Sequence, residues 1–318
     1  MGKRKKKTNH PKNRFNTPKT PIMKKNRLLF VLLLTLLGSC KKSDDKGSTA
    51  ACNSITNTQI LVHEGLERAY VLYVPNSYTG NRAVPLLFNF HGFGGRANDF
   101  MKTADMRALA ESETFILVYP QGSCLAGSPH WNACPPGGEN KSEADDLGFV
   151  TAIINELSSE YRVDSERIYA AGYSNGGMMA YGLANYKSDL IAAVASVSGA
   201  MLDCTGATTH PMPVVHLHGT NDAVLPYSGN SDWNAVQATL DHWINFNHTS
   251  ATPTVSSDTR GGMTIEHYVY AQGDNAVAVE HYKYLGGEHV WFNATYEGQS
   301  TAELVWNFVS RYDINGLR

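Results

Sequence analysis

The sequence predicts an α/β fold in which a mainly parallel central sheet carries helices on both faces. Short, continuously apolar stretches such as 83–90 and 115–119 are typical of strands that are buried on both sides. Longer stretches with helical apolar spacing, such as 145–161 and 232–246, alternate with these strands along the chain. This alternation indicates βαβ units, and in parallel sheets of this kind the chemistry gathers at the carboxyl ends of the strands.

The elements are expected in a simple order. Two antiparallel strands, 59–63 and 68–74, come first and are joined by a turn at Glu64-Gly65. The later strands are expected at 83–90, 115–119, 167–172, 191–198, 214–217, 263–270 and 277–285, and the helices at 98–112, 145–161, 175–186, 232–246 and 301–311. The long segment 120–143 has no periodicity of its own, which predicts a functional loop. No repeat or second domain is evident, so we expect residues 54–318 to form one domain.

The charge of the chain is small overall but unevenly distributed. The sequence has 27 Lys and Arg, 29 Asp and Glu and a formal net charge of −2. Basic residues crowd the first 27 positions, so the remainder is acidic. A surface for nucleic acid is therefore not indicated in the body of the protein.

Residues 1–40 are predicted to be a basic extension followed by a signal peptide. The apolar stretch 28–37 is too short to span a bilayer as a stable helix, follows a basic segment and ends before Gly38-Ser39-Cys40. This pattern resembles a bacterial lipoprotein signal, in which Cys40 would be lipidated. Two alternatives are an uncleaved anchor helix and a plain secretory signal, and translation could begin at Met1 or at Met23.

Each of these alternatives takes the remainder of the chain out of the cytoplasm. We expect residues 41–53, which are polar and free of aromatic side chains, to form a flexible tether. The expected location is the bacterial cell envelope, with the outer membrane favoured, or the extracellular space. Contact with a membrane is expected only through the lipid anchor.

Four cysteines remain once Cys40 is assigned to lipid: Cys52, Cys124, Cys134 and Cys204. An even number in an oxidising compartment predicts two disulfides, for which three pairings exist. Because Cys124 and Cys134 flank one loop rich in Gly and Pro, we expect them to pair, which leaves Cys52 with Cys204 by elimination. The alternative is four free, buried thiols.

The stretch 168–180 contains the motif Gly172-Tyr173-Ser174-Asn175-Gly176 between a predicted strand and a predicted helix. A strand, a sharp turn with serine at its tip and a helix form the context of a Gly-x-Ser-x-Gly nucleophile elbow. Glycine on both sides removes steric collisions and tolerates the strained backbone. A simpler interpretation is a glycine-rich turn with a solvated serine. The choice between the two interpretations depends on whether the sequence also contains the acid and the histidine of a catalytic triad.

The order serine, acid, histidine is the one found on α/β-hydrolase folds. Asp222 follows the strand 214–217 among turn-forming residues, and His289 lies on a glycine-rich loop after the last strand. We therefore predict Ser174 as nucleophile, His289 as base and Asp222 as the acid that orients the base. The alternative for Asp222 is a turn residue that bonds only to backbone amides.

An oxyanion hole needs two N–H donors near the nucleophile. We expect the amide of Asn175, directly after the serine, and the amide of Phe93, with Gly92 as the nearby alternative. His91, in the same loop, is expected to brace it through hydrogen bonds.

His216 and His218 share one face of a strand and could together contact a metal ion. No third ligand is evident nearby, so neither a metal nor any other cofactor is expected.

Five motifs now occur in a fixed order. They are His91-Gly-Phe-Gly-Gly, Asp145-Asp-Leu-Gly-Phe, Gly172-Tyr-Ser-Asn-Gly-Gly-Met-Met, His218-Gly-Thr-Asn-Asp and Gly286-Gly-Glu-His-Val-Trp. Together they resemble the polyhydroxybutyrate depolymerase and feruloyl/acetyl-xylan esterase group of α/β hydrolases. The resemblance implies a serine-esterase mechanism through an acyl-enzyme, with Ser174, Asp222 and His289 as the triad and no cofactor. Glu288 and Phe292 replace a glycine and a proline that the family usually has, so the shape of the acyl pocket is expected to differ.

Three aromatic residues, Trp131, Tyr227 and Trp291, are expected on loops near the triad, where they could stack on a sugar or a phenolic acyl group. The alternative for each is ordinary packing. Because no polymer-binding domain is evident in the sequence, we expect soluble ester substrates, above all feruloyl or acetyl esters of plant polysaccharide fragments.

Three other functions stay open at this stage. The first is a depolymerase of polyhydroxybutyrate or of short polyester oligomers. The second is a peptidase of the same fold, and the third is a non-catalytic surface lipoprotein that binds glycans.

Overall fold

The computed structural model describes residues 2, 52, 58–138, 140–204 and 206–318. The expected signal peptide, the lipidation site Cys40 and most of the expected tether therefore lie outside the described residues. Among the helices of the described part, none has both the length and the apolar character that crossing a membrane requires.

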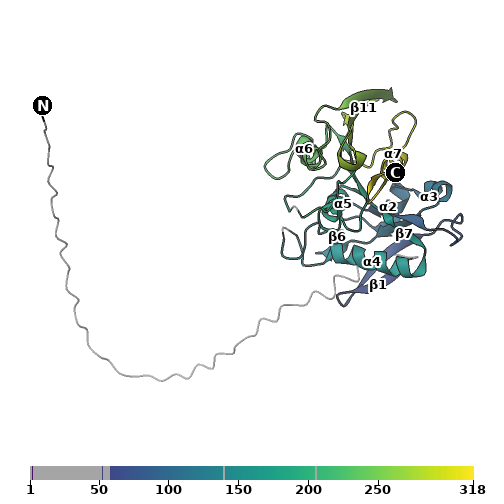
Figure 1. The fold of residues 1–318 in the computed structure, drawn as a ribbon. Coiled ribbons are helices and arrows are strands. Elements are labelled where there is room, and N and C mark those ends of the chain that lie inside the picture. Colours follow the sequence, from purple (N-terminus) through teal and green to yellow (C-terminus); the bar gives the residue numbers. More distant parts are fainter. Residues whose placement is uncertain (1, 3–51, 53–57, 139, 205) are drawn as a thin grey trace, which may run out of the picture. The chain divides into compact units, whose positions relative to one another are not determined.

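A ten-stranded mixed sheet forms the centre of the fold (Figure 1). Its strand order is β1-β2-β4-β3-β7-β8-β9-β12-β11-β10. The strands are β1 (Gln59–His63), β2 (Leu66–Tyr73), β3 (Val84–Phe90), β4 (Ile116–Pro120), β7 (Val163–Tyr173), β8 (Ala193–Val197), β9 (Val214–Gly219), β10 (Thr254–Arg260), β11 (Met263–Tyr270) and β12 (Val279–Leu285). The six strands from β4 to β12 in this order are parallel, while the strands at both edges pair antiparallel. The predicted α/β-hydrolase architecture is therefore confirmed.

Helices cover both faces of the sheet and bury two separate apolar layers. Because side chains alternate along a strand, Leu86 and Phe88 of β3 face one layer and Leu87 faces the other. The helices α4 (Asp146–Glu160), α5 (Asn175–Tyr186) and α6 (Val236–Phe246) pack on the first layer. The second layer is covered by α2 (Ala97–Thr103), α3 (Arg107–Glu113) and α7 (Thr301–Val309). All of the strands that lead to the candidate site are thus held between two packed layers.

The single helix expected at 98–112 is wrong, since α2 ends before α3 begins. The hydroxyl of Tyr119 donates to the carbonyl of Ala104 at 2.6 Å and accepts from the amide of Met106 at 3.3 Å. The Asp105 carboxylate accepts from the Arg107 amide at 3.0 Å, which starts the second helix. A buried tyrosine on β4 therefore interrupts a pattern that looks continuous in sequence.

Several short or exposed elements were not predicted. The edge strand β10 is mostly exposed, so its sequence has no apolar alternation to reveal it. The segment 120–143 contains a small hairpin of β5 (Ser123–Leu125) and β6 (Ser128–His130). A second small pair, β13 (Tyr312–Asp313) and β14 (Gly316–Leu317), closes the chain.

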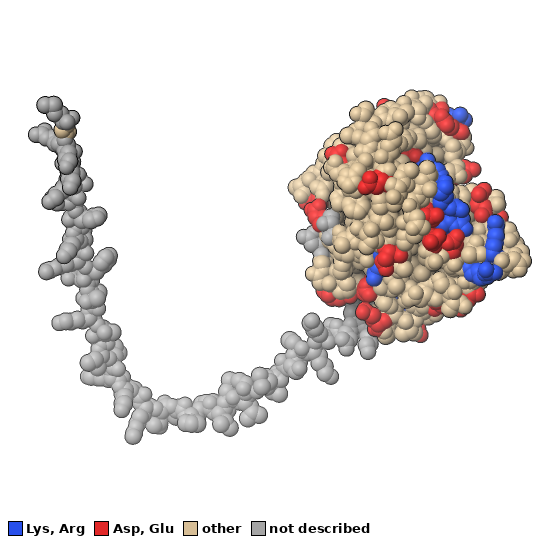
Figure 2. Space-filling model, viewed as in Figure 1, with Lys and Arg blue, Asp and Glu red and all other residues tan. Residues whose placement is uncertain are grey.

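Charged side chains of both signs lie side by side on the face of the molecule shown in Figure 2. Many form short-range pairs, for example Arg107 with Asp105 at 2.6 Å and Lys283 with Glu266 at 3.0 Å. Exposed pairs of this kind contribute little stability each, so the two buried layers hold the fold together.

The expected disulfide pairing is wrong. The structure pairs Cys52 with Cys124 and Cys134 with Cys204, with Cα atoms 5.7 Å and 5.9 Å apart. The hairpin of β5 and β6 separates Cys124 from Cys134 and turns them toward different neighbours. Next to Cys134, the carbonyl of Ala133 packs so closely against Gly182 of α5 that no side chain fits there. The nine residues between Cys124 and Cys134 are therefore a folded unit and not a loop that a disulfide closes.

Non-reducing peptide mapping is expected to recover Cys52–Cys124 and Cys134–Cys204 as the linked pairs. Replacing both Cys134 and Cys204 by Ser should lower the free energy of unfolding by about 2–5 kcal/mol. Without the disulfide, the unfolded chain is no longer closed across a sequence separation of 70 residues and has more conformations open to it. Urea titration of the double variant beside the wild type measures this difference. Recovery of a Cys124–Cys134 peptide would contradict the pairing.

Candidate active site

Ser174 stands at the tip of a sharp turn between β7 and α5. Its backbone has φ 55° and ψ −120°, a strained conformation for a residue with a side chain. A Cβ at Gly172 would overlap the carbonyl of Gly176, and a Cβ at Gly176 would overlap the carbonyl of Phe90. The amide of Ser174 donates to the carbonyl of Val197 at 2.9 Å. Close packing between two strands and a helix thus holds the serine in this conformation.

The structure brings Ser174, His289 and Asp222 into one hydrogen-bonded line. His289 Nε2 lies 2.8 Å from Ser174 Oγ, and His289 Nδ1 lies 2.7 Å from Asp222 Oδ2. Asp222 lies on the loop after β9, and His289 lies on the loop after β12, the strand next to β9. Since carboxyl ends of parallel strands meet at one edge of the sheet, residues 115 positions apart come together.

Asp222 is buried and yet well provided with hydrogen-bond donors. The amides of Val224 and Leu225 both donate to Oδ1 at 2.8 Å, and His218 Nε2 lies 3.2 Å from Oδ2. Burial alone would raise the pKa of Asp222, but the hydrogen bonds from His218, His289 and the Leu225 amide outweigh burial and lower the pKa. The carboxylate is therefore ionised at neutral pH and able to orient His289.

The two expected oxyanion donors belong to segments that adjoin Ser174. Asn175 is the first residue of α5, and the first amides of a helix have no acceptor within the helix. Gly92 packs against the serine, since a Cβ at Gly92 would come within 3.3 Å of Ser174 Cβ. Phe93 follows directly and is half exposed. This arrangement can present two amides to an oxygen above the serine.

His91 braces the loop that carries Gly92 and Phe93. Its Nδ1–H donates to the carbonyl of Gly92 at 2.7 Å, and its Nε2 accepts from the amide of Gly122 at 3.0 Å. Burial lowers the pKa of His91 to about 4, so the ring is neutral and can accept and donate in this way.

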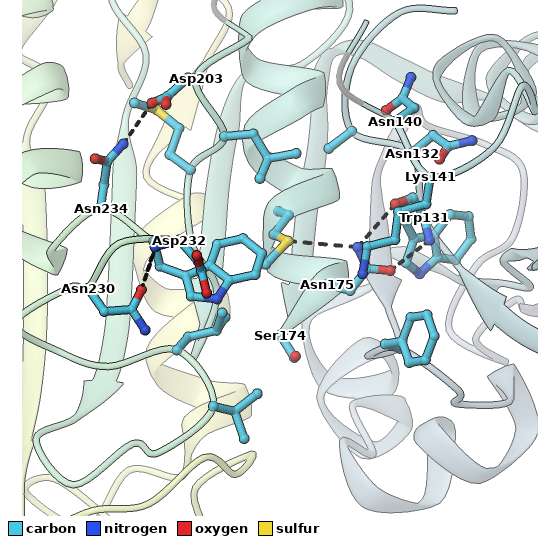
Figure 3. Close-up of a pocket in the computed structure, with 18 of the residues that line it drawn as sticks. Trp131, Asn132, Asn140, Lys141, Ser174, Asn175, Asp203, Asn230, Asp232 and Asn234 are labelled. Atoms are coloured by element: carbon cyan, nitrogen blue, oxygen red, sulfur yellow. Dashed lines mark hydrogen bonds between the residues drawn. The ribbon is translucent and has the colours of Figure 1, made fainter.

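A cavity of about 530 Å³ opens beside Ser174 (Figure 3). One wall carries Trp131 and Asn132 from the segment 120–143, and Figure 3 shows Asn140 and Lys141 on the same side of the cavity. The side chain of Asn175 holds this wall against the turn, because it accepts from the Trp131 amide at 2.7 Å and donates to the Trp131 carbonyl at 3.0 Å. Asn175 thus has a second role in the structure that the motif alone did not reveal.

The opposite wall was not predicted. It is formed by Asp203, Asn230, Asp232, Trp233 and Asn234. The sequence pattern places Trp233 on the apolar face of a helix that begins at 232, but α6 begins only at Val236. The cluster of turn-forming residues before that helix was the available signal, because Asn230 Oδ1 accepts from the amides of Asp232 and Trp233.

The three aromatic residues expected near the triad lie in different places. Trp131 lines the cavity, although it is buried and its Nε1–H donates to the carbonyl of His91 at 2.9 Å. Tyr227 lies beside His218, with ring centres 6.0 Å apart, and its hydroxyl donates to His281 Nε2 at 2.9 Å. Trp291 packs edge-on against Phe100 and lines a separate cavity of about 750 Å³ on the other side of Phe93. Of the three, only Trp131 shares a cavity with Ser174 in the described part of the chain.

The histidines considered as metal ligands bond to each other. His216 Nε2 lies 3.1 Å from His218 Nδ1, so the nitrogens that would face a shared ion are already paired. A different group, His63, Glu64 and Asp145, places three possible ligand atoms within 4.8 Å of one another. In that group His63 Nε2 already lies within hydrogen-bond distance, 3.3 Å, of Asp145 Oδ2. This group lies at the edge of the sheet, on β1 and its turn and at the start of α4.

Comparison with known families gives one extended match. A family model described as "Esterase PHB depolymerase" matches residues 68–235, which is more than half of the chain. The match covers the segments of His91, Ser174 and Asp222 and ends before His289.

Several characterised or named proteins are similar along most of this chain. A bifunctional acetylxylan esterase/xylanase of Neocallimastix patriciarum is 28% identical over 80% of this chain and 34% of its own length. A feruloyl esterase B of Piromyces equi is 26% identical over 78% of this chain and 46% of its own length. A putative esterase NocK of Nocardia uniformis is 28% identical over 77% of this chain and 76% of its own length. The chain thus spans less than half of the first two proteins.

Solved structures share the architecture at lower sequence identity. An acetyl xylan esterase from Aspergillus awamori superposes with a TM-score of 0.56 at 16% identity, over 73% of this chain and 94% of that one. A thermostable esterase gives a TM-score of 0.54 at 16% identity, over 80% of this chain and 62% of that one. At this identity the likeness supports the fold alone.

Proposed function

Since the chain belongs to the esterase PHB depolymerase family, we propose that it hydrolyses carboxylic esters with Ser174, His289 and Asp222 as its triad. The observation that carries the proposal is the continuous hydrogen-bonded line from Ser174 Oγ through His289 to Asp222. A strained serine, a base in contact with it and a buried, ionised acid are the parts that nucleophilic acyl transfer needs.

The geometry gives each group a step. Ser174 Oγ attacks the ester carbonyl carbon while its proton passes to His289 Nε2. The carbonyl oxygen becomes negatively charged and is stabilised by the amides of Asn175 and Phe93. His289 then gives the proton to the leaving alcohol oxygen, which leaves an acyl group on Ser174. Water then attacks the carbonyl carbon of the acyl group while its proton passes to His289 Nε2. His289 returns this proton to Ser174 Oγ as the bond to the acyl group breaks and the acid is released.

Asp222 contributes throughout by holding His289 in the tautomer with hydrogen on Nδ1. It also stabilises the imidazolium that forms after each proton transfer. Its carboxylate remains ionised because the hydrogen bonds around it lower its pKa.

We further propose that the alcohol part of the substrate is a polysaccharide fragment carrying feruloyl or acetyl esters. Two relatives that match more than three quarters of this chain are an acetylxylan esterase/xylanase and a feruloyl esterase. The wall around Trp233 supports this choice, since it combines a partly exposed indole ring with two carboxylates and two amides. Aromatic faces stack on sugar rings and carboxylates accept from their hydroxyl groups, whereas a polyester offers no hydroxyl groups along its chain. Hydroxybutyrate and other short polyester oligomers are the second candidate.

Export of the chain is proposed from its cysteines. Disulfides persist in oxidising compartments, and the structure pairs all four cysteines of the described part. The sequence pattern before Cys40 supports a lipid anchor in the bacterial envelope.

An organophosphate such as diisopropyl fluorophosphate is expected to label Ser174 and abolish hydrolysis of p-nitrophenyl acetate. Ser174→Ala should lose at least about 10³-fold in kcat, because no nucleophile remains and only the oxyanion donors act. Initial rates and intact mass of the labelled protein measure both effects.

Ser198→Ala is the matched control, since this buried serine also lies at a strand end but bonds to the carbonyl of Val290. Turnover of peptides without turnover of esters would select a peptidase instead. Measurable glycan binding without any turnover would select a non-catalytic lipoprotein.

Trp233→Ala is expected to raise KM for a feruloylated or acetylated xylo-oligosaccharide by roughly fivefold, the loss of about 1 kcal/mol of ring contact. Rates on methyl ferulate, which has no sugar, should stay within a factor of two. Trp233→Phe keeps a ring and serves as the matched control. An equal loss of activity on the xylo-oligosaccharide ester and on methyl ferulate would count against a polysaccharide fragment as the alcohol part of the substrate. Turnover of hydroxybutyrate oligomers by the wild type that is faster than turnover of the xylo-oligosaccharide ester would also count against it.

Metabolic labelling with an alkyne fatty acid in a bacterial host is expected to mark the full-length chain and not the Cys40→Ser variant. The wild type should fractionate with membranes through this anchor. An unlabelled wild type would favour a plain secretory signal or an uncleaved anchor.

A further inference from the structure

A row of buried polar side chains continues the triad beyond Asp222. The hydroxyl of Tyr181 lies 2.7 Å from His216 Nδ1, and His216 Nε2 lies 3.1 Å from His218 Nδ1. His218 Nε2 lies 2.8 Å from the carbonyl of Leu225 and 3.2 Å from Asp222 Oδ2. Tyr181, His216 and His218 are all buried.

The direction of each hydrogen bond in this row follows from its two ends. Both neighbours of His218 Nε2 are oxygens that can only accept, so this nitrogen carries the hydrogen. If His218 Nδ1 accepts, His216 must donate from Nε2. His216 Nδ1 then accepts from the Tyr181 hydroxyl, which leaves every buried donor in the row with an acceptor.

The opposite arrangement would reverse each hydrogen bond between these three side chains. A protonated His218 would donate from Nδ1, and His216 would have to donate to Tyr181, whose own hydrogen would need another acceptor. Besides His216, the buried hydroxyl of Ser196 is a second hydrogen-bonding group beside Tyr181, so in that arrangement Ser196 would have to accept the hydrogen of Tyr181. Burial, followed by the nearby His218 and His281, lowers the pKa of His216 well below its usual value, so His216 is neutral.

We propose that His218 is a positioning residue for the triad, and that Tyr181 and His216 set its tautomer so that it donates to Asp222. The inference rests on the proposed roles of Ser174, His289 and Asp222. Asp222 Oδ2 receives both histidines, while Oδ1 receives the two loop amides. The donor from His218 holds the same carboxylate oxygen that His289 contacts and moderates the negative charge that His289 meets.

Other charged and titratable groups surround this row. His281 of β12 donates from Nδ1 to the carbonyl of His216 at 2.9 Å and accepts from Tyr227. Tyr227 also lies edge-on to His218, with ring centres 6.0 Å apart. Lys283, the register partner of His218 on β12, pairs with Glu266 at 3.0 Å. None of these groups touches Asp222 among the contacts of the described residues, so they offer controls.

The decisive experiment follows the imidazole of His289 by NMR as pH changes, in the wild type and in variants. His218→Ala removes one donor from Asp222, so the carboxylate holds the His289 imidazolium more tightly. The midpoint of the His289 titration is expected to rise by about one pH unit, the equivalent of a tenfold change in equilibrium. The acidic limb of the pH profile of kcat/KM should shift to higher pH by the same amount. We expect kcat of His218→Ala to be roughly tenfold lower and KM to be little changed.

His218→Gln is the conservative variant, since its side-chain N–H can occupy the place of Nε2–H, and it should restore most of both effects. Tyr181→Phe leaves every triad contact intact but frees the tautomer of His216, and it should give a smaller change in the same direction as His218→Ala. His281→Gln is the matched control in the same buried cluster and should lower stability without moving the His289 titration.

A His289 midpoint that is unchanged or lower in folded His218→Ala would overturn the proposal, as would a His218→Gln variant no better than His218→Ala. Circular dichroism and the fraction labelled by an organophosphate identify folded protein. If wild-type protein hydrolyses no ester, the proposed function fails, but the NMR titration still decides the role of His218.

Discussion

The active site depends on one steric constraint, the close contact of α5 with the ends of two strands. Gly176 packs against the carbonyl of Phe90, and Gly172 packs against the backbone of Gly176, so neither position has room for a side chain. The helix can approach the sheet this closely only when Ser174 adopts a positive φ. The same approach sets the Asn175 amide and the serine side by side. Strain at one residue is thus stabilised by packing of its neighbours.

A second anchor holds the segment 120–143 over this turn. The buried Asp146 carboxylate accepts from Arg68 Nη2 at 2.6 Å, from the Asn132 amide at 2.7 Å and from Ser123 Oγ at 3.2 Å. Arg68 comes from β2 and also stacks over Phe149 at 4.1 Å. A buried ion pair is costly to break, because removing one partner leaves the other charged and unpaired. Two side chains therefore hold the cavity wall, Asp146 through Asn132 and Asn175 through Trp131.

Local patterns in the sequence predicted the central strands, the elbow and the order of the triad residues. Each of these depends on neighbours in the chain, such as glycine around Ser174 or an apolar run before Asp222. The disulfide pairing, the break between α2 and α3 and the wall around Trp233 could not be predicted in this way. Cys134 meets Cys204 and Tyr119 interrupts a helix only because distant segments fold together. The histidine pair was recognised, but its orientation toward Asp222 depends on the loop that ends at Leu225.

The corrected disulfide changes how the cavity is understood. Cys134 follows the wall formed by Trp131 and Asn132, and Cys204 follows Asp203 on the opposite wall. The bond therefore joins the two walls directly, while Asp203 accepts from Asn234 at 2.7 Å and ties the Trp233 segment to the same point. The width of the cavity beside Ser174 is thus set by a covalent bond that forms only under oxidising conditions. A fold made in a reducing compartment would still have Ser174 and His289 held in place by the sheet, but no disulfide would fix the distance between the two walls of the cavity.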